Sequence, residues 1–101
     1  MNEYQKALMD KPSIETEACA ICGRYVRTQR HHIVLRAQGG TDGPTVTLCG
    51  YGNAGGCHGA AHGQMLHFRY TDRWQYLETD VPVKYEKALD MEGWRDVQIQ
   101  R

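Results

Sequence analysis

The chain has 101 residues, equal numbers of basic and acidic side chains (12 of each) and a hydrophobic content of 41%. This length predicts one domain, whose core is small enough to need a metal ion or disulfides as reinforcement. No apolar run approaches the roughly 20 residues of a membrane-spanning helix. The N-terminus also lacks the basic start and apolar stretch of a secretory signal, so we expect a cytoplasmic protein.

The charge is distributed unevenly, although the formal net charge is zero. Residues 18–70 contain five arginines and one acidic residue, Asp42, and so carry a net charge of +4. The flanking regions, residues 1–17 and 71–101, carry −2 each. Because the planar guanidinium group can bind two oxygens of an anion such as phosphate at once, we expect the middle region to bind an anionic partner.

Hydrophobic spacing predicts short helices and strands. We expect a helix at residues 3–10, where Tyr4, Ala7 and Leu8 fall on one face, followed by a linker. Residues 57–65 are a further helix candidate, which its two glycines weaken. Strand-like runs and glycine-rich loops lie between these helices. The strand-like runs are residues 25–28, 31–35 and 45–49, and the loops are residues 38–44 and 50–56.

The C-terminal part predicts a β-hairpin followed by a helix. Residues 66–70 and 73–79 are rich in aromatic and β-branched side chains and flank a two-residue turn. The helix is expected to start near Pro82, with Asp80 as its cap, and to stop at Gly93. Three large aromatic residues are interpreted as core residues of this extension, namely Trp74, Tyr76 and Trp94.

Four cysteines have the spacing of a metal site. Cys19 and Cys22 form C-x2-C, and Cys49 and Cys57 form C-x7-C. The second spacer exceeds the usual two to four residues, but its four glycines allow it to fold back and deliver both sulfurs. A closed tetrahedral zinc site would stabilise so short a chain. The alternative is two disulfides or free buried thiols, and disulfides suit a chain without a secretion signal less well.

Four of the five histidines form two pairs. His31 and His32 are neighbours, whereas His58 and His62 stand four residues apart. On a helix, that spacing stacks both imidazoles on one face, as in helical metal sites. Such a pair alone often occurs by chance on a protein surface, but it gains weight beside the cysteines and the first pair. His67 is interpreted as a structural or surface histidine.

The combination CAIC…RHHIVLRAQGG…TVTLC…CHGAAH, within residues 19–62, resembles the HNH endonuclease family of the ββα-metal class. Its compact form, with a glycine-rich second cysteine loop, is similar to small phage-encoded HNH proteins. The resemblance implies a single α+β domain over residues 1–101. Its zinc-stabilised, treble-clef-like ββα core would occupy 19–62, after a short N-terminal helix, and the hairpin and helix would form an extension at 64–101.

The resemblance also implies a role for each histidine of the motif. The second residue of the dipeptide is the general base in the family, which assigns this role to His32. The first residue is a metal ligand, which assigns His31, and His58 and His62 complete the ligand set of one divalent ion. These three histidines most resemble the ligands of DNase colicin nuclease domains. The candidate ions are Mg, Mn, Ni, Co and Zn, and three imidazoles disfavour magnesium.

The reaction that the resemblance implies is hydrolysis of a DNA phosphodiester. His32 would accept a proton from the attacking water, while the metal ion would stabilise charge on the phosphate. Arg36 is placed to meet a phosphate oxygen, and Arg24, Arg27 and Arg30 to position the DNA backbone. For any single arginine, a solvated basic face is an equally good interpretation. Similarity to small phage proteins implies packaging (terminase) proteins as partners.

Two features leave an alternative open. The family has an asparagine five residues before the third cysteine, where it braces the loop that carries the base, but Pro44 occupies this position. Neighbouring side chains of a regular strand also point to opposite faces, so His31 and His32 can serve one site only if the strand is distorted or ends there. The alternative is a non-catalytic zinc module that binds DNA or protein. The four histidines favour the enzyme, because such a module needs only the cysteines.

Overall fold

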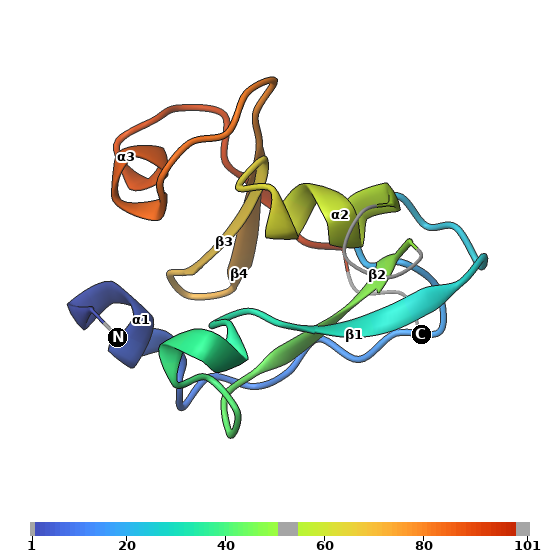
Figure 1. Cartoon of the computed structure of the whole chain (residues 1–101), viewed down its shortest axis with the longest axis horizontal. Helices are drawn as coiled ribbons and strands as arrows, with labels where there is room; N and C mark the ends of the chain where they lie inside the picture. The colour runs from blue at the N-terminus through green and yellow to red at the C-terminus, as the bar shows by residue number, and fades with distance from the viewer. Residues whose placement is uncertain (1, 51–54, 99–101) are drawn as a thin grey trace.

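The computed structural model describes residues 2–50 and 55–98, so most of the predicted glycine-rich loop at 50–56 lies outside the described residues. The chain alternates between short helices and strands (Figure 1). In chain order they are α1 (Glu3–Leu8), β1 (Thr28–His32), the 3-10 helix η1 (Arg36–Gln38), β2 (Thr45–Cys49), α2 (Gly56–His62), β3 (Leu66–Tyr70), β4 (Trp74–Glu78), α3 (Tyr85–Leu89) and β5 (Arg95–Asp96).

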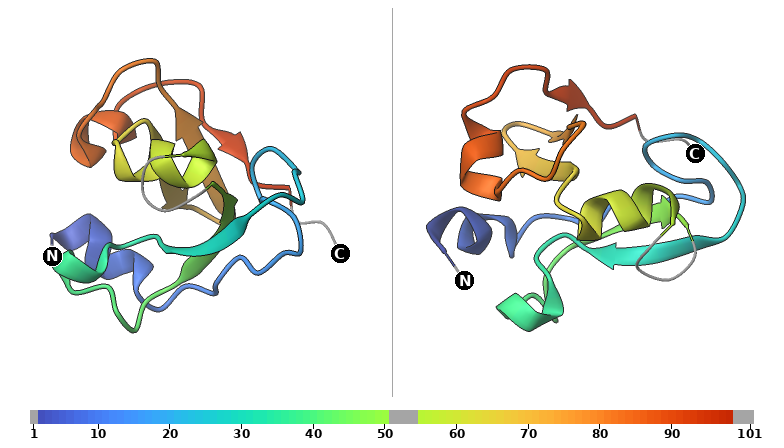
Figure 2. Two further views of the ribbon diagram at one scale, coloured as in Figure 1. Left: turned by 45° about the vertical axis from the view of Figure 1, so that its right-hand side comes forward. Right: turned by 45° about the horizontal axis from the view of Figure 1, so that its top comes forward.

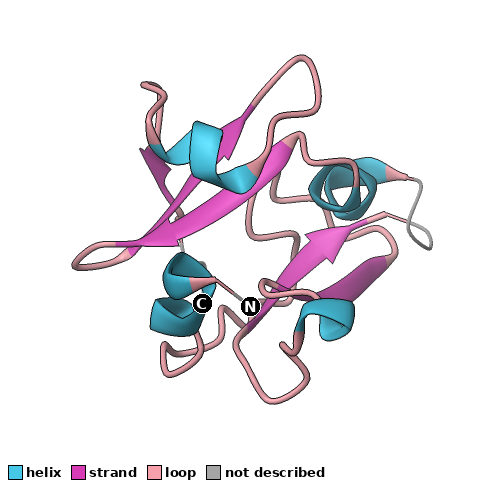
Figure 3. Ribbon diagram, turned by 60° about the vertical axis from the view of Figure 1, so that its left-hand side comes forward, coloured by secondary structure: helices cyan, strands magenta, loops and turns pink. Residues whose placement is uncertain are grey.

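The strands form two separate antiparallel sheets (Figure 3). β1 pairs with β2 from Thr28 opposite Cys49 to His32 opposite Thr45. The second sheet has the order β3-β4-β5, and α2 contacts β2 of the first sheet and β3 of the second (Figures 1 and 2). The result is a small, compact α+β fold with a radius of gyration of 12.4 Å. None of its described helices is long and apolar enough to cross a membrane.

A shared hydrophobic core joins the two sheets to the N-terminal segment. Ile14, which forms a parallel bridge with Val46 of β2, is fully buried, as are Val34 and Leu48. Burial of one such side chain contributes about 1.5–3 kcal/mol to stability. Trp74 of β4 is also buried, and its indole N–H donates to the Pro12 carbonyl oxygen at 2.8 Å. The linker before the first cysteine is therefore packed between both sheets rather than left loose.

The helices predicted at 3–10 and 57–65 are present, but each is shorter than expected. α1 begins with a capping box, in which the Asn2 side chain accepts from the Gln5 N–H and the Gln5 side chain accepts from the Asn2 N–H. This arrangement satisfies two backbone donors at the helix start. α2 ends at His62. The Gly63 N–H still donates to the Gly59 carbonyl oxygen at 2.9 Å, but the next residue, Gln64, adopts a φ of +61°, which leaves the helical conformation.

The first predicted strands are displaced. The run at 25–28 is a strand only from Thr28, and Tyr25 and Val26 are exposed in a loop. The run at 31–35 is a strand only to His32, and the prediction is wrong for the three residues that follow. Pro44 stands at the end of the ladder and has no N–H to donate, so regular pairing stops there. The strand predicted at 45–49 is confirmed as β2.

The predicted C-terminal hairpin is confirmed by β3 and β4, but the predicted start and stop of the helix are both wrong, since α3 ends at Leu89 rather than at Gly93. α3 begins at Tyr85, and Lys84 occupies the N-cap without a side-chain hydrogen bond, so Asp80 is not the cap. The reason is that the Val83 N–H donates to the Gln64 carbonyl oxygen at 2.9 Å, which keeps the preceding segment out of the helix. β5 was not expected from the sequence, since it contains only two residues.

Candidate metal centres

The four cysteine side chains converge, and their sulfur atoms all lie within 4.8 Å of one another. Cys19 and Cys22 come from a tight turn before β1, Cys49 ends β2, and Cys57 belongs to the first turn of α2. The Cys22 and Cys49 sulfurs are 3.4 Å apart, and all four are free thiols. A zinc ion with Zn–S bonds of about 2.3 Å holds its sulfurs about 3.8 Å apart. Both the donors and their spacing therefore fit a zinc ion.

Two glycines allow Cys49 and Cys57 to reach the same point. Gly50 has a φ of +133°, and a Cβ there would lie 2.0 Å from the Gly55 carbonyl oxygen. Gly56 has a φ of +60°, and a Cβ there would lie 2.7 Å from the Cys49 carbonyl oxygen. Any side chain at either position would push the two segments apart. The long C-x7-C spacer is thus usable because glycines stand at both of its ends.

The cysteine thiols shift one another's pKa values through hydrogen bonds within the cluster. A hydrogen bond from the Cys57 thiol lowers the pKa of Cys19 to about 4, and the same contact raises the pKa of Cys57. Burial raises the pKa of Cys22. A divalent cation among the sulfurs would stabilise all four as thiolates. The cluster has the chemistry of a metal-binding group.

Three histidine rings form a second cluster, with ring nitrogens within 4.8 Å of one another. His31 comes from β1, and His58 and His62 come from the facing helix α2. The Nε2 atoms of His58 and His62 are 3.2 Å apart. Two imidazoles on a tetrahedral ion, at the usual 2.0–2.1 Å bond length, would be about 3.3 Å apart. The three rings fit one divalent ion, and a set of three protein donors leaves a coordination position open, as in catalytic sites.

His31 is deeply buried, with 4% of its surface exposed. Burial, followed by the neighbouring charges of His58 and His62, lowers the pKa of His31 to about 3. The ring is therefore neutral at pH 7 and keeps a nitrogen lone pair, which is the form that binds metals. Burying three imidazoles together is unfavourable unless their polar atoms find partners. A shared cation is one partner that all three rings can bind together.

His32 lies outside this cluster, at the end of β1, and is half-buried. Its Nδ1 is 3.1 Å from the Gly40 carbonyl oxygen. Because a carbonyl oxygen only accepts hydrogen bonds, Nδ1 must carry the proton, which leaves the lone pair on Nε2. The strand also ends at His32, which was one condition for the two neighbouring histidines to serve one site.

The sequence did not identify what holds the His32 ring. Gly40 contributes the carbonyl oxygen, and its own N–H donates to the Leu35 carbonyl oxygen at 3.0 Å. A Cβ at Gly40 would lie 1.8 Å from the Val34 carbonyl oxygen, so only glycine fits. The Ile33 N–H donates to the Pro44 carbonyl oxygen at 3.1 Å and fastens the other side of the loop. The sequence feature that could have indicated this contact to the His32 ring is the pair Gly39-Gly40.

The four arginines predicted to bind DNA are all exposed, but they do not form one patch. Arg24 and Arg27 precede β1, Arg30 lies within it, and Arg36 begins η1, four residues after His32. Arg30 forms an exposed ion pair with Glu15, with 3.6 Å between Nη1 and Oε1. The four arginines are therefore spread from the loop before β1 to η1, and Glu15 partly neutralises the charge of Arg30.

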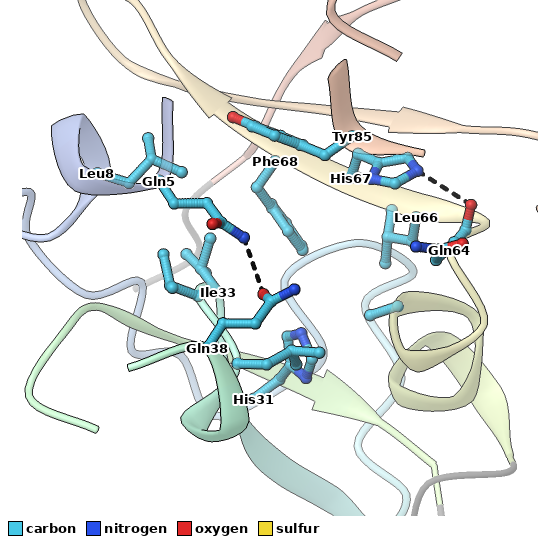
Figure 4. Close-up of a pocket in the computed structure, with 13 residues that line it drawn as sticks. Gln5, Leu8, His31, Ile33, Gln38, Gln64, Leu66, His67, Phe68 and Tyr85 are labelled. Carbon is cyan, nitrogen blue, oxygen red and sulfur yellow. Dashed lines mark hydrogen bonds between the residues drawn. The ribbon is translucent and has the colours of Figure 1, made fainter. Parts of the chain in front are cut away.

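A cavity of about 90 Å³ lies beside His31 and is walled mostly by apolar side chains (Figure 4). The Gln5 side chain closes one side by donating to the Gln38 side chain at 2.8 Å. His67 lines the opposite part, buried, with its Nε2 3.0 Å from the Gln64 carbonyl oxygen. This bond agrees with the interpretation of His67 as structural. Among the three clustered histidines only His31 lines the cavity, so the cavity is separate from the point where their nitrogens meet.

No protein-family model, curated protein or solved structure matches this chain. The structure shows a small α+β fold with antiparallel sheets, which brings together four cysteines and, separately, three histidines. Each cluster is suited to hold a metal ion. Any proposal about family, activity or partners must be argued from the chemistry of these clusters and from the resemblance of the sequence motifs.

Proposed function

We propose that the protein is a metal-dependent DNA endonuclease of the HNH type, which hydrolyses phosphodiester bonds. The observation that supports this most is the division of the metal-binding residues into two clusters. Four cysteines suffice for a structural ion, whereas the separate histidine cluster has the three donors of a catalytic site. A hairpin followed by a helix, with the histidines between them, is also what a ββα-metal core would require.

His32 is the proposed general base. Its Nδ1–H is held by the Gly40 carbonyl oxygen, so the lone pair on Nε2 is free to accept a proton from water. Help of this kind typically accelerates a reaction 10²–10⁴-fold. Arg36 is exposed nearby in sequence and would bind a phosphate oxygen, which orients the substrate. The proton leaves the attacking water as its oxygen bonds to phosphorus and the bond to the 3′ oxygen breaks.

His31, His58 and His62 are the proposed ligands of the catalytic divalent ion. When bound, such an ion supplies stabilisation of negative charge on the phosphate and on the leaving oxygen. Imidazole donors favour Ni, Co, Mn or Zn, and Mg is the least favoured candidate. The four cysteines would hold a structural zinc ion. Action beside phage packaging (terminase) proteins rests on the resemblance to small phage proteins alone.

One observation favours a second function, a zinc module that binds DNA or protein without cutting. Pro44 replaces the asparagine that braces the base in the resembling family. The Pro44 carbonyl oxygen nevertheless accepts from the Ile33 N–H, and the Gly40 carbonyl oxygen holds His32. Backbone groups thus supply the bracing that an asparagine side chain would give. This argument favours the enzyme over the module.

The test is plasmid cleavage by chelator-treated protein that keeps its zinc and receives Mg, Mn, Ni, Co or Zn in turn. We expect metal-dependent cutting by the wild type and a loss of at least 10²-fold in His32→Ala, the lower end of the range for general-base help. Glu78→Ala, at an exposed position of β4 away from β1, is the control and should cut normally. Equal cutting by wild type and His32→Ala would exclude this base. No cutting with any ion, while DNA still binds, would favour the module.

A further inference from the structure

The loop that leads into β1 exposes two apolar side chains between two arginines. It consists of Arg24, Tyr25, Val26 and Arg27 and is called the RYVR loop below. Tyr25 is 73% exposed and Val26 is 61% exposed. Among the large hydrophobic residues exposed within the described ranges, these two are the only ones adjacent in sequence. Large contiguous apolar patches mark interaction sites, whereas apolar residues exposed singly are normal, so this adjacent pair carries weight only together with the two arginines beside it.

The RYVR loop is anchored at both ends. The Cys19 N–H donates to the Arg24 carbonyl oxygen at 2.9 Å, and the Gly50 N–H donates to the Arg27 carbonyl oxygen at 2.9 Å. Both donors are at the cysteine cluster, since Cys19 belongs to it and Gly50 follows Cys49. Arg27 also adopts a φ of +40°, which residues other than glycine rarely do. Such a conformation persists where surrounding contacts impose it.

Anchoring makes the exposure of the tip a fixed property of the fold. The segment before β1 runs along an outer edge of the molecule, close to the start of α2 (Figures 1 and 2). Because the ends of the RYVR loop are held, its tip is already ordered before a partner binds. Binding then loses little conformational entropy. If the loop only connected two parts of the chain, exposing the apolar side chains of Tyr25 and Val26 to water would be unfavourable without any compensation.

The surrounding charge identifies the kind of partner. Residues 18–41 contain four arginines and no acidic residue, although Glu15 and Glu17 precede them and Glu15 pairs with Arg30. An aromatic ring between guanidinium groups matches a nucleic-acid strand, whose bases offer faces for stacking and whose phosphates lie on either side. An apolar protein surface would match the tyrosine and valine but would leave the two arginines desolvated. Of these two partners, nucleic acid fits the tyrosine and both arginines.

The position of the RYVR loop relates it to the candidate catalytic cluster. Arg27 and His31 are four residues apart, and most of that distance is strand, so they are separated by about 13 Å. That length corresponds to roughly four base pairs of duplex DNA. A strand bound along β1 would reach the RYVR loop a few nucleotides from the bond that is cut.

We infer that the RYVR loop is a DNA-contact element in which Tyr25 stacks on an accessible base while Arg24 and Arg27 bind the neighbouring phosphates. This inference rests on the proposed function for DNA as the substrate. Stacking needs an exposed base face, so unpaired bases are bound better than paired ones. The consequence is that removal of the ring weakens binding of single-stranded DNA more than binding of duplex DNA.

The experiment measures binding of a labelled single-stranded oligonucleotide, and of its duplex, by zinc-loaded protein that carries His32→Ala to prevent cutting. In this background, Tyr25→Ala should weaken single-strand binding about tenfold, the loss expected for one base–aromatic stack. Tyr25→Phe keeps the ring and should bind normally. Tyr4→Ala removes another exposed tyrosine, in α1, and should change nothing. Zinc content shows that each variant is folded.

Three results would overturn the inference: wild-type affinity in Tyr25→Ala, an equal loss in Tyr4→Ala, or no single-strand binding by any protein. Cleavage by Tyr25→Ala with an intact His32 separates this failure from that of the proposed function. Wild-type binding and cutting by Tyr25→Ala would remove the RYVR loop and leave the nuclease. Weaker binding by Tyr25→Ala, when the wild type cuts no DNA, would remove the nuclease and leave a DNA-binding surface.

Discussion

The cysteine and histidine clusters use the same helix in different ways. The first has four donors and is closed by glycine turns, whereas the second has three donors and an open position. Cys57 and His58 are neighbours at the start of α2, so an ion held by the cysteines would also fix the helix that carries two of the histidines. The comparison teaches that a residue of one cluster can position residues of the other, because Cys57 and His58 are adjacent on the same helix.

The largest expected effect breaks the first cluster. In Cys49→Ser, the sulfur that ends β2 is lost, and we expect the proposed structural zinc ion to be lost with it. Such an ion contributes about 10–16 kcal/mol in small zinc domains, which is comparable to the whole stability of a domain. We expect loss of zinc and of the cooperative thermal transition in circular dichroism. An unchanged melting temperature in zinc-depleted Cys49→Ser would show that the cysteines do not stabilise the fold through a metal.

A smaller effect is expected when the loop that positions His32 is changed while the rest of the fold is kept. Gly40→Ala places a methyl group against the Val34 backbone, so the loop that holds His32 must shift. Overpacking of this kind costs about 1–3 kcal/mol, and we expect cutting to fall more than tenfold while zinc is retained. Gly63→Ala is the milder comparison, because a Cβ there would lie 3.3 Å from the Gly59 carbonyl oxygen, a tight contact that a shift of a few tenths of an ångström relieves. Normal cutting by Gly40→Ala would show that this carbonyl does not position the base.

The smallest effect compares two exposed arginines by the salt dependence of DNA binding. Arg36→Ala should reduce the dependence by about one counterion, because one phosphate contact is lost. Arg30→Ala should reduce it less, since Glu15 already balances part of its charge. Identical slopes for Arg36→Ala and the wild type would mean that Arg36 does not meet a phosphate.

The sequence predicted the clusters better than it predicted the ends of the strands. The four cysteines come together as predicted, and His58 and His62 share α2, because C-x2-C and H-x3-H are local patterns of turns and helices. That His31 joins the two helix histidines was implied only by the resemblance, since it comes from the distant strand β1. The strand at 31–35 was misplaced because its register depends on pairing with β2, which lies beyond Pro44. Long-range pairing of this kind leaves little trace in local hydrophobic patterns.

Contacts made by the backbone were the least predictable part of the site. Nothing in the sequence identifies the Gly40 carbonyl oxygen as the partner of His32, because any residue has a carbonyl and only the fold brings this one close. The exposure of Tyr25 was missed for a related reason. Its β-prone neighbours indicate a strand, but the hydrogen bonds from Cys19 and Gly50 hold the segment as a loop.

The most direct test of the account is the number of metal ions bound per chain, measured by equilibrium dialysis of wild type and His58→Ala against zinc. We predict two ions in the wild type and one in His58→Ala, with the fold and the remaining ion unchanged, because only the histidine cluster has lost a donor. Two ions in His58→Ala, or one in the wild type, would contradict the division into a structural and a catalytic centre.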